Sequence, residues 1–308
     1  MDKTLRVQHL AGFGLEVPDI QVAEAFYTAF GLNAGTEDEV MHLRTDAALK
    51  NSAPSEIVVV KGAGQKRLQH LSFAVLPEDI PRFEEHLHGM GVRTVTPPFG
   101  QLRQGLWFQD PWGTWINLVP TVPHALELSA VTIEPRIDRH LWQDLRQSVR
   151  PDKLGHLLIF TPEWERSEQF FAQALGLRVS DRAVGKVSFM SGGSGVRDHH
   201  CFGLINGTHR GLQHGSFHVS SVDQVGLGGL QMHKAGFKEG FGVGRHALAS
   251  NFFHYTRDPW GTWVEYYADM DKISEAWTPK DWNELPYIWP QWAPEFWGKE
   301  MNANHEAG

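Results

Sequence analysis

Apolar residues along the chain follow two spacings, one typical of helices and one typical of strands. Between Ile20 and Phe30 apolar side chains lie four residues apart and Gly31 follows, which predicts an amphipathic helix that ends at the glycine. Trp164 to Leu175, followed by Gly176, repeat this pattern. The runs between such helices alternate apolar and polar residues and are bounded by Gly, Pro and Asp, which predicts hairpin strands. The chain is therefore expected to mix helices with short strands.

One unit of strand and helix occurs four times. Each copy opens with a short apolar strand whose third residue is a histidine, and a polar turn and an amphipathic helix follow; these histidines are His9, His70, His156 and His214. Short strands are expected after each helix. Because a recurring pattern indicates a fold built from copies of one supersecondary unit, we predict four βαβββ units.

A longer repeat indicates how the units are grouped. The hexapeptide Asp110 to Trp115 recurs without change at Asp258 to Trp263, 148 residues later (258 − 110). Its Asp, Pro and Gly suit a type I turn that leads into a final strand. We therefore predict an α+β protein of two homologous domains, residues 1–125 and 151–275, each made of two paired βαβββ units that form a barrel-like cup.

Two further segments fall outside these domains. Residues 126–150 are expected to be a linker with a short helix near Asp138 to Ser148. Residues 276–308 form a tail that contains five of the twelve tryptophans: Trp277, Trp282, Trp289, Trp292 and Trp297. So aromatic a segment is expected to be covered, as a lid over a cup, as a subunit contact or as plain packing on the surface.

Composition excludes several kinds of partner. Of the 308 residues, 28 are basic and 36 acidic, the net charge is −8, and no stretch concentrates the basic residues, so nucleic acid is not an expected partner. The single cysteine, Cys201, excludes an intramolecular disulfide and is typical of a reducing compartment. The start of the chain has no long apolar run, and runs such as Ile57 to Val60 are too short to span a bilayer. We therefore expect a cytoplasmic protein that does not bind a membrane.

Three residues of the second half have the types and places of metal ligands. His156 and His214 occupy the same position in two paired units, and Glu265 lies on the last strand, on the same face as Trp263 and Tyr267. A carboxylate is costly to bury on so aromatic a face unless a cation or several donors meet it. Two imidazoles and one carboxylate form the facial triad that leaves open positions on Fe(II). Either histidine alone is better interpreted as a core residue, and Glu265 alone as the partner of an arginine; together they predict a metal site.

The first half provides an internal comparison. His9 and His70 correspond to the two histidines, but Asn117 stands at the carboxylate position. Without an anionic ligand the first cup offers only neutral donors to a divalent cation. We therefore predict that it holds no metal and has a structural role.

Five segments carry a resemblance to a known family. They are Gly155 to Leu157, His199 to Leu204, Leu212 to Val219, Gly244 to His246 and Tyr255 to Glu265. With the four units, they resemble the type I extradiol ring-cleaving (catechol) dioxygenases of the vicinal oxygen chelate superfamily, also called the glyoxalase/bleomycin resistance superfamily. The resemblance covers nearly the whole chain and implies the vicinal oxygen chelate fold, with the site inside the cup of the second half.

The resemblance also implies a cofactor and residue roles. It makes the three candidate ligands the ligands of Fe(II), O2 the cosubstrate and a small aromatic diol the substrate. His200 matches the family's acid-base histidine, a role suited to a group whose reference pKa is about 6.5. His246 and Tyr255 match residues that hydrogen-bond the catechol or the oxygen-derived group. Mn(II) accepts the same ligands, so the sequence leaves the metal open.

Simpler interpretations exist for these residues. His199 competes with His200, and since neighbouring side chains on a strand face opposite ways, we assign only His200 to the cup. His200 could instead lie at the surface beside the loop 191–197, His246 could cap a turn, and Tyr255 could be an ordinary strand aromatic.

Two more residues near the site have no role in the motif. His218 lies two residues beyond His214, and we expect it to support the metal ligands or to lie in the core. Cys201 is interpreted as a buried small hydrophobe.

The neighbourhood of His246 bears on the substrate. Family members that act on acidic catechols tend to present arginines near the cup, one of them shortly before the histidine that His246 matches. Here that stretch is Phe241 to Arg245, and the tail has no arginine. We therefore predict an apolar or aryl-substituted catechol, unless Arg245 points into the cup.

Two other functions use the same scaffold. A metal-dependent isomerase or lyase of the glyoxalase kind would work without oxygen, but it usually needs a further carboxylate, which Asn117 does not supply. A ligand-sequestering protein would not need an intact set of two histidines and one glutamate. We therefore predict an enzyme, an extradiol dioxygenase, and expect it to act as a homo-oligomer.

Overall fold

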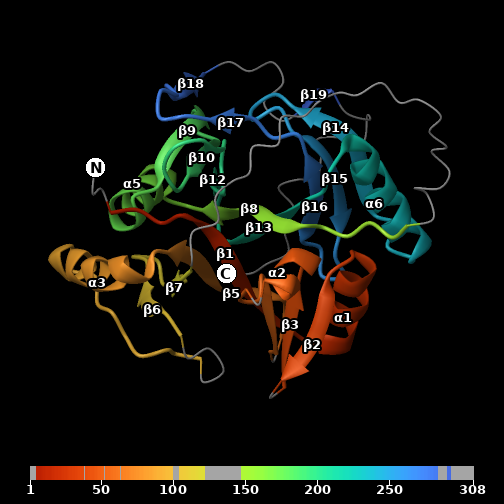
Figure 1. Ribbon diagram of the computed structural model, residues 1–308, viewed down its shortest axis with the longest axis horizontal. Helices are drawn as coiled ribbons and strands as arrows, with labels where there is room; N and C mark the ends of the chain where they lie inside the picture. Colours follow the sequence, from red (N-terminus) through yellow and green to blue (C-terminus); the bar gives the residue numbers. More distant parts are fainter. Residues whose placement is uncertain are drawn as a thin grey trace.

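The computed structural model describes residues 5–37, 39–51, 53–62, 64–99, 104–121, 147–283 and 290–292. Over these ranges the chain forms a seven-stranded sheet from its first half and a ten-stranded sheet from its second half, with helices on their outer sides (Figure 1). None of the helices in these ranges is long and apolar enough to cross a membrane. Residues 138–146 of the predicted linker helix lie outside the described residues.

The first half contains two successive units. The first consists of β1 (His9–Val17), α1 (Ile20–Ala29), β2 (Asn33–Glu37), β3 (Val40–Arg44), α2 (Asp46–Lys50) and β4 (Ile57–Lys61). The second consists of β5 (Arg67–Val75), the 3-10 turn η1 (Pro77–Asp79), α3 (Ile80–Gly89), β6 (Leu106–Gln109) and β7 (Trp115–Pro120). The strand order is β2-β3-β4-β1-β5-β7-β6, so the opening strands of the two units lie side by side.

The second half repeats this design. Its first unit consists of β8 (Lys153–Thr161), α5 (Trp164–Leu175), β9 (Arg178–Ala183), β10 (Val187–Ser191), β11 (Arg197–Asp198) and β12 (Phe202–Asn206). Its second consists of β13 (Gly211–His218), α6 (Val222–Lys234), β14 (Gly240–His246), β15 (Phe252–Arg257) and β16 (Trp263–Ala268). The order β9-β10-β12-β8-β13-β16-β15 matches that of the seven strands of the first half, and β14 adds a further strand beside β15, which confirms the predicted vicinal oxygen chelate architecture.

Three short strands follow β16. β17 (Lys272–Ile273) pairs with β11 in a separate two-stranded sheet. β18 (Lys280–Trp282) and β19 (Pro290–Trp292) extend the second sheet, beside β9 and β14 respectively. β18 and β19 are therefore at opposite edges of the same sheet. Trp289 and Trp297 of the tail lie outside the described residues, so its role as a lid or contact stays a prediction.

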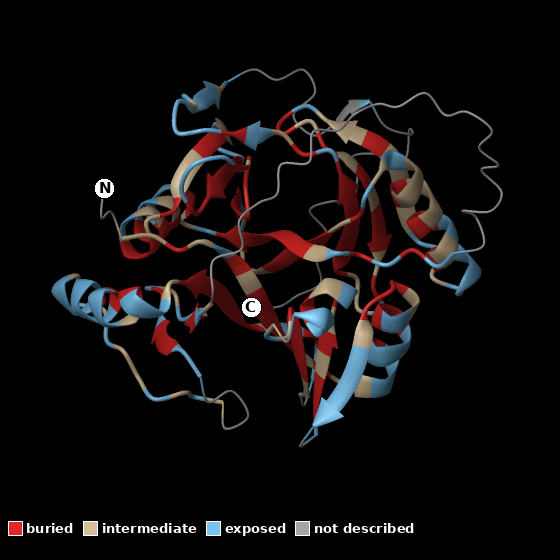
Figure 2. Cartoon of the chain, in the orientation of Figure 1, coloured by how far each residue is buried: buried red, intermediate tan, exposed pale blue. Residues whose placement is uncertain are grey.

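Burial follows the predicted pattern of apolar positions. The strands are largely buried and the outward faces of the helices are exposed (Figure 2). The two halves share one core: the ring of Phe30 stacks on Tyr266 at 3.8 Å between centroids, and the Tyr266 hydroxyl donates to the Phe30 carbonyl at 2.8 Å. Gly176 ends α5 with φ 66°, in the left-handed region that favours glycine.

Both copies of the hexapeptide form the predicted turn. The Gly113 N–H donates to the Asp110 carbonyl at 3.0 Å, and Gly261 makes the same bond to Asp258. The turns join β6 to β7 and β15 to β16. Each therefore begins the last strand of its half, which is the strand on which the sequence places Asn117 or Glu265.

The strand registers correct one part of the predicted repeat. In the first half His70 lies opposite Gly14, and in the second half His214 lies opposite Leu158. His156 is two positions before Leu158, so the corresponding residue of β1 is two positions before Gly14. That residue is Gly12, and the prediction that His9 matches His156 is wrong. His9 is exposed, at the first position of β1.

Candidate metal centre

His156, His214 and Glu265 come together from three adjacent strands. His156 on β8 lies opposite Ser216 of β13, and Ser216 lies opposite Glu265 of β16. His156 Nε2 is 3.0 Å from Glu265 Oε2, and His214 Nε2 is 3.5 Å from the same oxygen. One ligand atom from each residue lies within 4.8 Å of the others, and all three side chains are buried. The structure thus gathers the three ligands that the sequence predicts.

A bulge in β13 orients His214. The register passes from Leu212 opposite Ile159 to His214 opposite Leu158, so Gln213 is an extra residue in the strand. This lets neighbouring side chains meet, and His214 Nδ1 hydrogen-bonds the Gln213 side-chain oxygen. An amide oxygen only accepts, so Nδ1 carries the proton and Nε2 presents its lone pair.

The donor set fits a divalent metal. His214 Nε2 is buried and has no hydrogen-bond partner among the described residues, although the carboxylate of Glu265 is close to it. Such an orphaned atom is costly unless a further group meets it. A cation between the carboxylate and the two imidazoles would use the lone pair that Gln213 exposes.

Electrostatics favour the same protonation states. Burial alone would raise the pKa of Glu265, but hydrogen bonds with His156 and His246 and the neighbouring imidazoles hold that pKa far below its usual value. Burial lowers the pKa of His214 to about 3. Near pH 7 the site therefore contains a carboxylate anion beside a neutral His214, the forms in which these groups bind a metal.

A cavity opens directly on these groups. Together with the solvent at its mouth it amounts to about 340 Å³ of space not filled by atoms. It is lined by His156, Leu158, Phe189, His200, His214, His246, Leu248, Asn251 and Tyr255. His200, His246 and Tyr255, the residues that the resemblance implies for catalysis, therefore share one cavity with two of the candidate ligands. Among the described residues that line it there is no lysine or arginine.

His246 and Tyr255 connect the cavity to Glu265. His246 Nε2 is 3.1 Å from the Tyr255 hydroxyl and 3.5 Å from Glu265 Oε1. Burial, and then the nearby carboxylate, hold the pKa of Tyr255 well above its usual value, so the phenol keeps its proton. Tyr255 is therefore a donor at the cavity wall.

Other predicted residues lie away from the cavity. His218 pairs with Asp152 at 2.7 Å at the surface side of β13, which does not match the expected support of a ligand. Arg245 pairs with Asp269 at 3.2 Å. Cys201 is buried, as predicted, and burial raises the pKa of its thiol to about 11.

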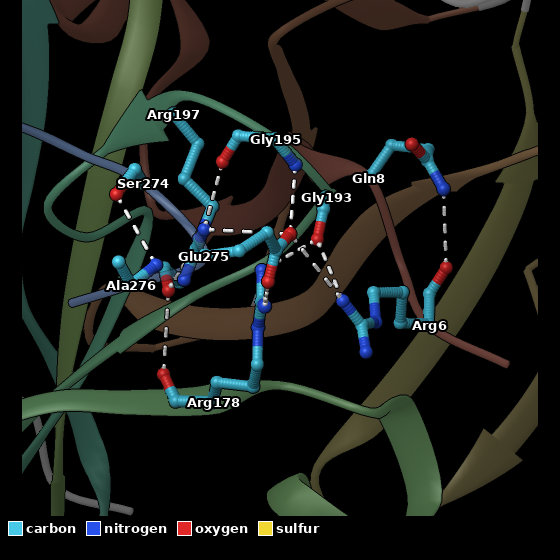
Figure 3. Close-up of polar contacts among 10 residues, drawn as sticks. Arg6, Gln8, Arg178, Gly193, Gly195, Arg197, Ser274, Glu275 and Ala276 are labelled. Carbon is cyan, nitrogen blue, oxygen red and sulfur yellow. Dashed lines mark hydrogen bonds and ion pairs between the residues drawn. The ribbon is translucent and has the colours of Figure 1, made fainter. Parts of the chain in front are cut away.

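Glu275 holds the segment after β17 against the loop 191–197. The Gly195 N–H donates to Glu275 Oε1 at 2.7 Å, and the Glu275 carboxylate also pairs with Arg178 (Figure 3). Arg6 and Arg197 approach the same carboxylate at 3.9 and 3.8 Å. One side chain thus ties the start of the chain, the loop 191–197 and residues 274–276 together.

Three residues in or near the candidate metal centre were not predicted from the sequence. Asn251 lines the cavity with its Nδ2 3.5 Å from Glu265 Oε1, and no repeat or motif includes it. Gln213 could have been noticed, because Gln69 precedes His70 in the other half and makes the same contact at 3.1 Å. Asp181, which is described below, is distant in sequence from every motif.

Comparisons with known proteins agree with this geometry. The model of the glyoxalase/bleomycin resistance protein/dioxygenase superfamily matches residues 153–266. The chain is 34% identical over 307 residues to metapyrocatechase 2 of Cupriavidus necator, covering 96% of this chain and 93% of that protein.

Solved structures share the fold. The Mn(II)-bound glyoxalase from Novosphingobium aromaticivorans superposes with a TM-score of 0.76 at 20% identity, covering 94% of this chain and 91% of that one. The 2,3-dioxygenase LapB from Pseudomonas sp. KL28 gives 0.71 at 20% identity, covering 91% and 98%. The protein thus has the fold of the glyoxalase and dioxygenase superfamily. The identity to metapyrocatechase 2 over almost the whole chain shows that it belongs, within that superfamily, to the extradiol ring-cleaving dioxygenases.

Proposed function

We propose that the protein cleaves the ring of a catechol next to its two hydroxyl groups, with Fe(II) as its metal and O2 as cosubstrate, and that its catechols carry apolar substituents. The observation that supports this most is the buried set of His156, His214 and Glu265, two of which line a cavity together with His200. Two imidazoles and one carboxylate leave several metal positions open for substrates.

The reaction divides between the metal and the side chains. When bound, Fe(II) supplies neighbouring coordination positions for both catechol oxygens and for dioxygen, through which electron density can pass. His200 is the proton carrier: burial and the surrounding imidazoles hold its pKa well below 6.5, so near pH 7 it is neutral and can accept the proton of a catechol hydroxyl. Tyr255 and His246 are placed to hydrogen-bond the bound substrate.

The wall of the cavity favours an apolar ring substituent. Leu158, Phe189 and Leu248 contribute aliphatic and aromatic surface. Arg245, the cation whose direction the sequence left open, is paired with Asp269 and packs over the Phe252 ring at 4.4 Å. A carboxylated catechol would therefore lose its hydration without gaining a lysine or arginine partner from the described lining.

The test starts from anaerobic protein loaded with Fe(II), mixed with alkyl-, aryl- and carboxyl-substituted catechols, after which air is admitted. We expect oxygen uptake, a yellow ring-opened product and a higher kcat/KM for the apolar catechols. No uptake with any catechol despite full iron loading would refute the reaction. Equal or better use of carboxylated catechols would refute the substrate preference alone.

The identity of the metal needs a separate measurement. Metal content of the purified protein, followed by turnover after loading with Fe(II) or Mn(II), decides between the two ions. We expect Fe(II) to give the higher kcat. Conversion of a glutathione hemithioacetal without oxygen would instead favour an isomerase of the glyoxalase kind.

A further inference from the structure

Asp181, His199 and His200 form a continuous chain of hydrogen bonds behind the cavity. Asp181 Oδ2 lies 3.1 Å from His199 Nε2, and His199 Nδ1 lies 3.1 Å from His200 Nδ1. All three residues are at most 4% exposed. Both histidines follow β11 in irregular backbone, so the alternation expected of a strand does not apply to them, and both side chains are buried.

The donors and acceptors in this series of hydrogen bonds determine where each proton lies. A carboxylate only accepts, so His199 Nε2 must donate to Asp181, and in the neutral imidazole the other nitrogen, Nδ1, must then accept. The only proton that can lie between the two Nδ1 atoms therefore belongs to His200. Its Nδ1 is protonated, and Nε2 is left as the nitrogen with a free lone pair.

We propose that Asp181 and His199 are positioning residues that hold His200 in the tautomer with the proton on Nδ1, so that Nε2 is the base of the cavity. This inference rests on the proposed function, because it concerns the histidine that accepts the substrate proton. The O–H bond of the catechol breaks, its proton goes to Nε2 of His200, and the resulting imidazolium continues to donate its Nδ1 proton to His199 Nδ1. The opposite tautomer would present an N–H to the hydroxyl and could not accept.

Contacts with Trp277 and Lys280 hold the side chains of His199 and Asp181 in these orientations. The Trp277 ring meets His199 edge to face at 5.7 Å, and its Nε1–H donates to the Ser180 carbonyl at 2.8 Å. The Lys280 backbone N–H donates to Asp181 Oδ1 at 2.7 Å. Each oxygen of Asp181 therefore has its own donor, and one of them is reserved for His199.

The Lys280 contact makes Asp181→Asn a sharp test. The side-chain oxygen of the asparagine is needed by the Lys280 N–H, so its NH2 group must face His199. His199 Nε2 then has to accept, its proton moves to Nδ1, and His200 Nδ1 has to accept in turn. An isosteric change should thus move the proton of His200 from Nδ1 to Nε2.

The experiment is two-dimensional NMR of protein labelled with 15N at histidine and loaded with Zn(II), which is diamagnetic. We expect the Nδ1–H tautomer of His200 in the wild type and the Nε2–H tautomer in Asp181→Asn, with His200→Gln used to assign its signals. An Nε2–H tautomer in the wild type, or an unchanged tautomer in the variant, overturns the inference. Neither reading requires turnover, so a failure here is distinct from a lack of catechol cleavage.

Activity of the Fe(II) enzyme gives the second readout. Asp181→Asn should lower kcat about 100-fold or more with little change in KM, since general base catalysis contributes on that scale. Asp198→Asn is the matched control, because Asp198 is a partly buried carboxylate next to His199 that pairs instead with Lys153 and Lys272. Its kcat should stay within about twofold; an equal loss in both variants would make the effect structural.

A conservative replacement separates the tautomer from packing. His199→Asn keeps an acceptor oxygen close to the position of Nδ1, whereas His199→Leu keeps the volume and removes the acceptor. We expect the first to retain most of kcat and the second to lose about as much as Asp181→Asn. In the His199→Asn background, Asp181→Asn should have no further effect; a full additional loss there would overturn the inference.

Discussion

Lys66 Nζ lies 2.5 Å from Oδ2 of Asp258, and both side chains are buried although they come from different halves of the chain. The other oxygen of Asp258 accepts the N–H groups of Trp260 and Thr262 inside the hexapeptide turn. Because β16 follows this turn, the ion pair connects the first half of the chain to the strand that carries Glu265.

Replacing the cation of this pair should destabilise the protein strongly. Lys66→Met leaves the carboxylate of Asp258 buried without a counter-charge, and such a change costs about 3–5 kcal/mol. Urea unfolding at pH 7 measures the loss. Lys61→Met, which alters an exposed lysine at the end of β4, should change the free energy of unfolding by less than about 0.5 kcal/mol. A similar small change for Lys66→Met would contradict the importance of the pair.

Glu265→Gln should remove most of the metal. The amide keeps the size of the side chain but loses the anion that balances the cation, and even indirect partners of a metal ligand contribute 10- to 100-fold to affinity, so we expect a loss above about 100-fold. Metal content after dialysis against a weak chelator is the measurement. Asn117→Ala, at the corresponding place in the first half, should leave metal content and turnover unchanged. Full metal content in the Glu265 variant would refute its role as a ligand.

His200→Ala should separate metal binding from catalysis. His200 lines the cavity but is outside the cluster of candidate ligands, so we expect metal content to be retained while kcat falls by about 10² to 10⁴. Steady-state oxygen uptake measures kcat, and metal analysis of the same preparation measures metal content. Wild-type rates with every catechol would remove the proton-carrying role.

Two histidines away from the candidate metal centre, His70, which is buried, and His254, which is partly buried, should make stability depend on pH. Burial lowers the pKa of His70 to about 3 and that of His254 to about 4. In the unfolded chain both titrate near 6.5, so below that pH the unfolded state binds protons that the folded state does not. Stability should therefore fall as the pH drops from 6.5 toward 4, by about 1.4 kcal/mol per pH unit for each residue.

Urea titrations with a chelator present, between pH 4.5 and 7, measure this slope without metal release. His70→Gln should reduce the slope by about one residue's share, and His88→Gln, which changes an exposed histidine of α3, should not. An identical slope in the two variants would contradict the assignment to His70.

Local patterns were sufficient for the fold but not for every alignment within it. The spacing of apolar residues located α1 and α5, and the hexapeptide repeat grouped the units in pairs, because both signals depend on residues close in sequence. His9 was aligned with His156 because both stand near the start of a strand. Strand pairing shows that Gly12 holds that position, and register is a property of two strands that one segment does not contain.

The candidate site could likewise be predicted from the sequence only in part. His156, His214 and Glu265 could be proposed because each occupies a definite place in a repeated unit, and the structure brings them together. Asp181 and Asn251 could not, because one reaches the site through His199 and the other from the turn between β14 and β15. Their roles depend on tertiary contacts, which no spacing along the chain encodes.

The backbone around Gly12 leaves no room in the first half for the side chain that His156 has in the second half. A Cβ atom added there would lie 2.8 Å from the Glu56 carbonyl oxygen and 2.9 Å from that of Ser55, both of them backbone atoms. In the first half the main chain itself therefore fills the space that an imidazole would need, and no single exchange of side chains could restore a second centre. A metal centre in the first half would therefore require the backbone at Gly12 to move away from residues 55 and 56, in addition to new side chains.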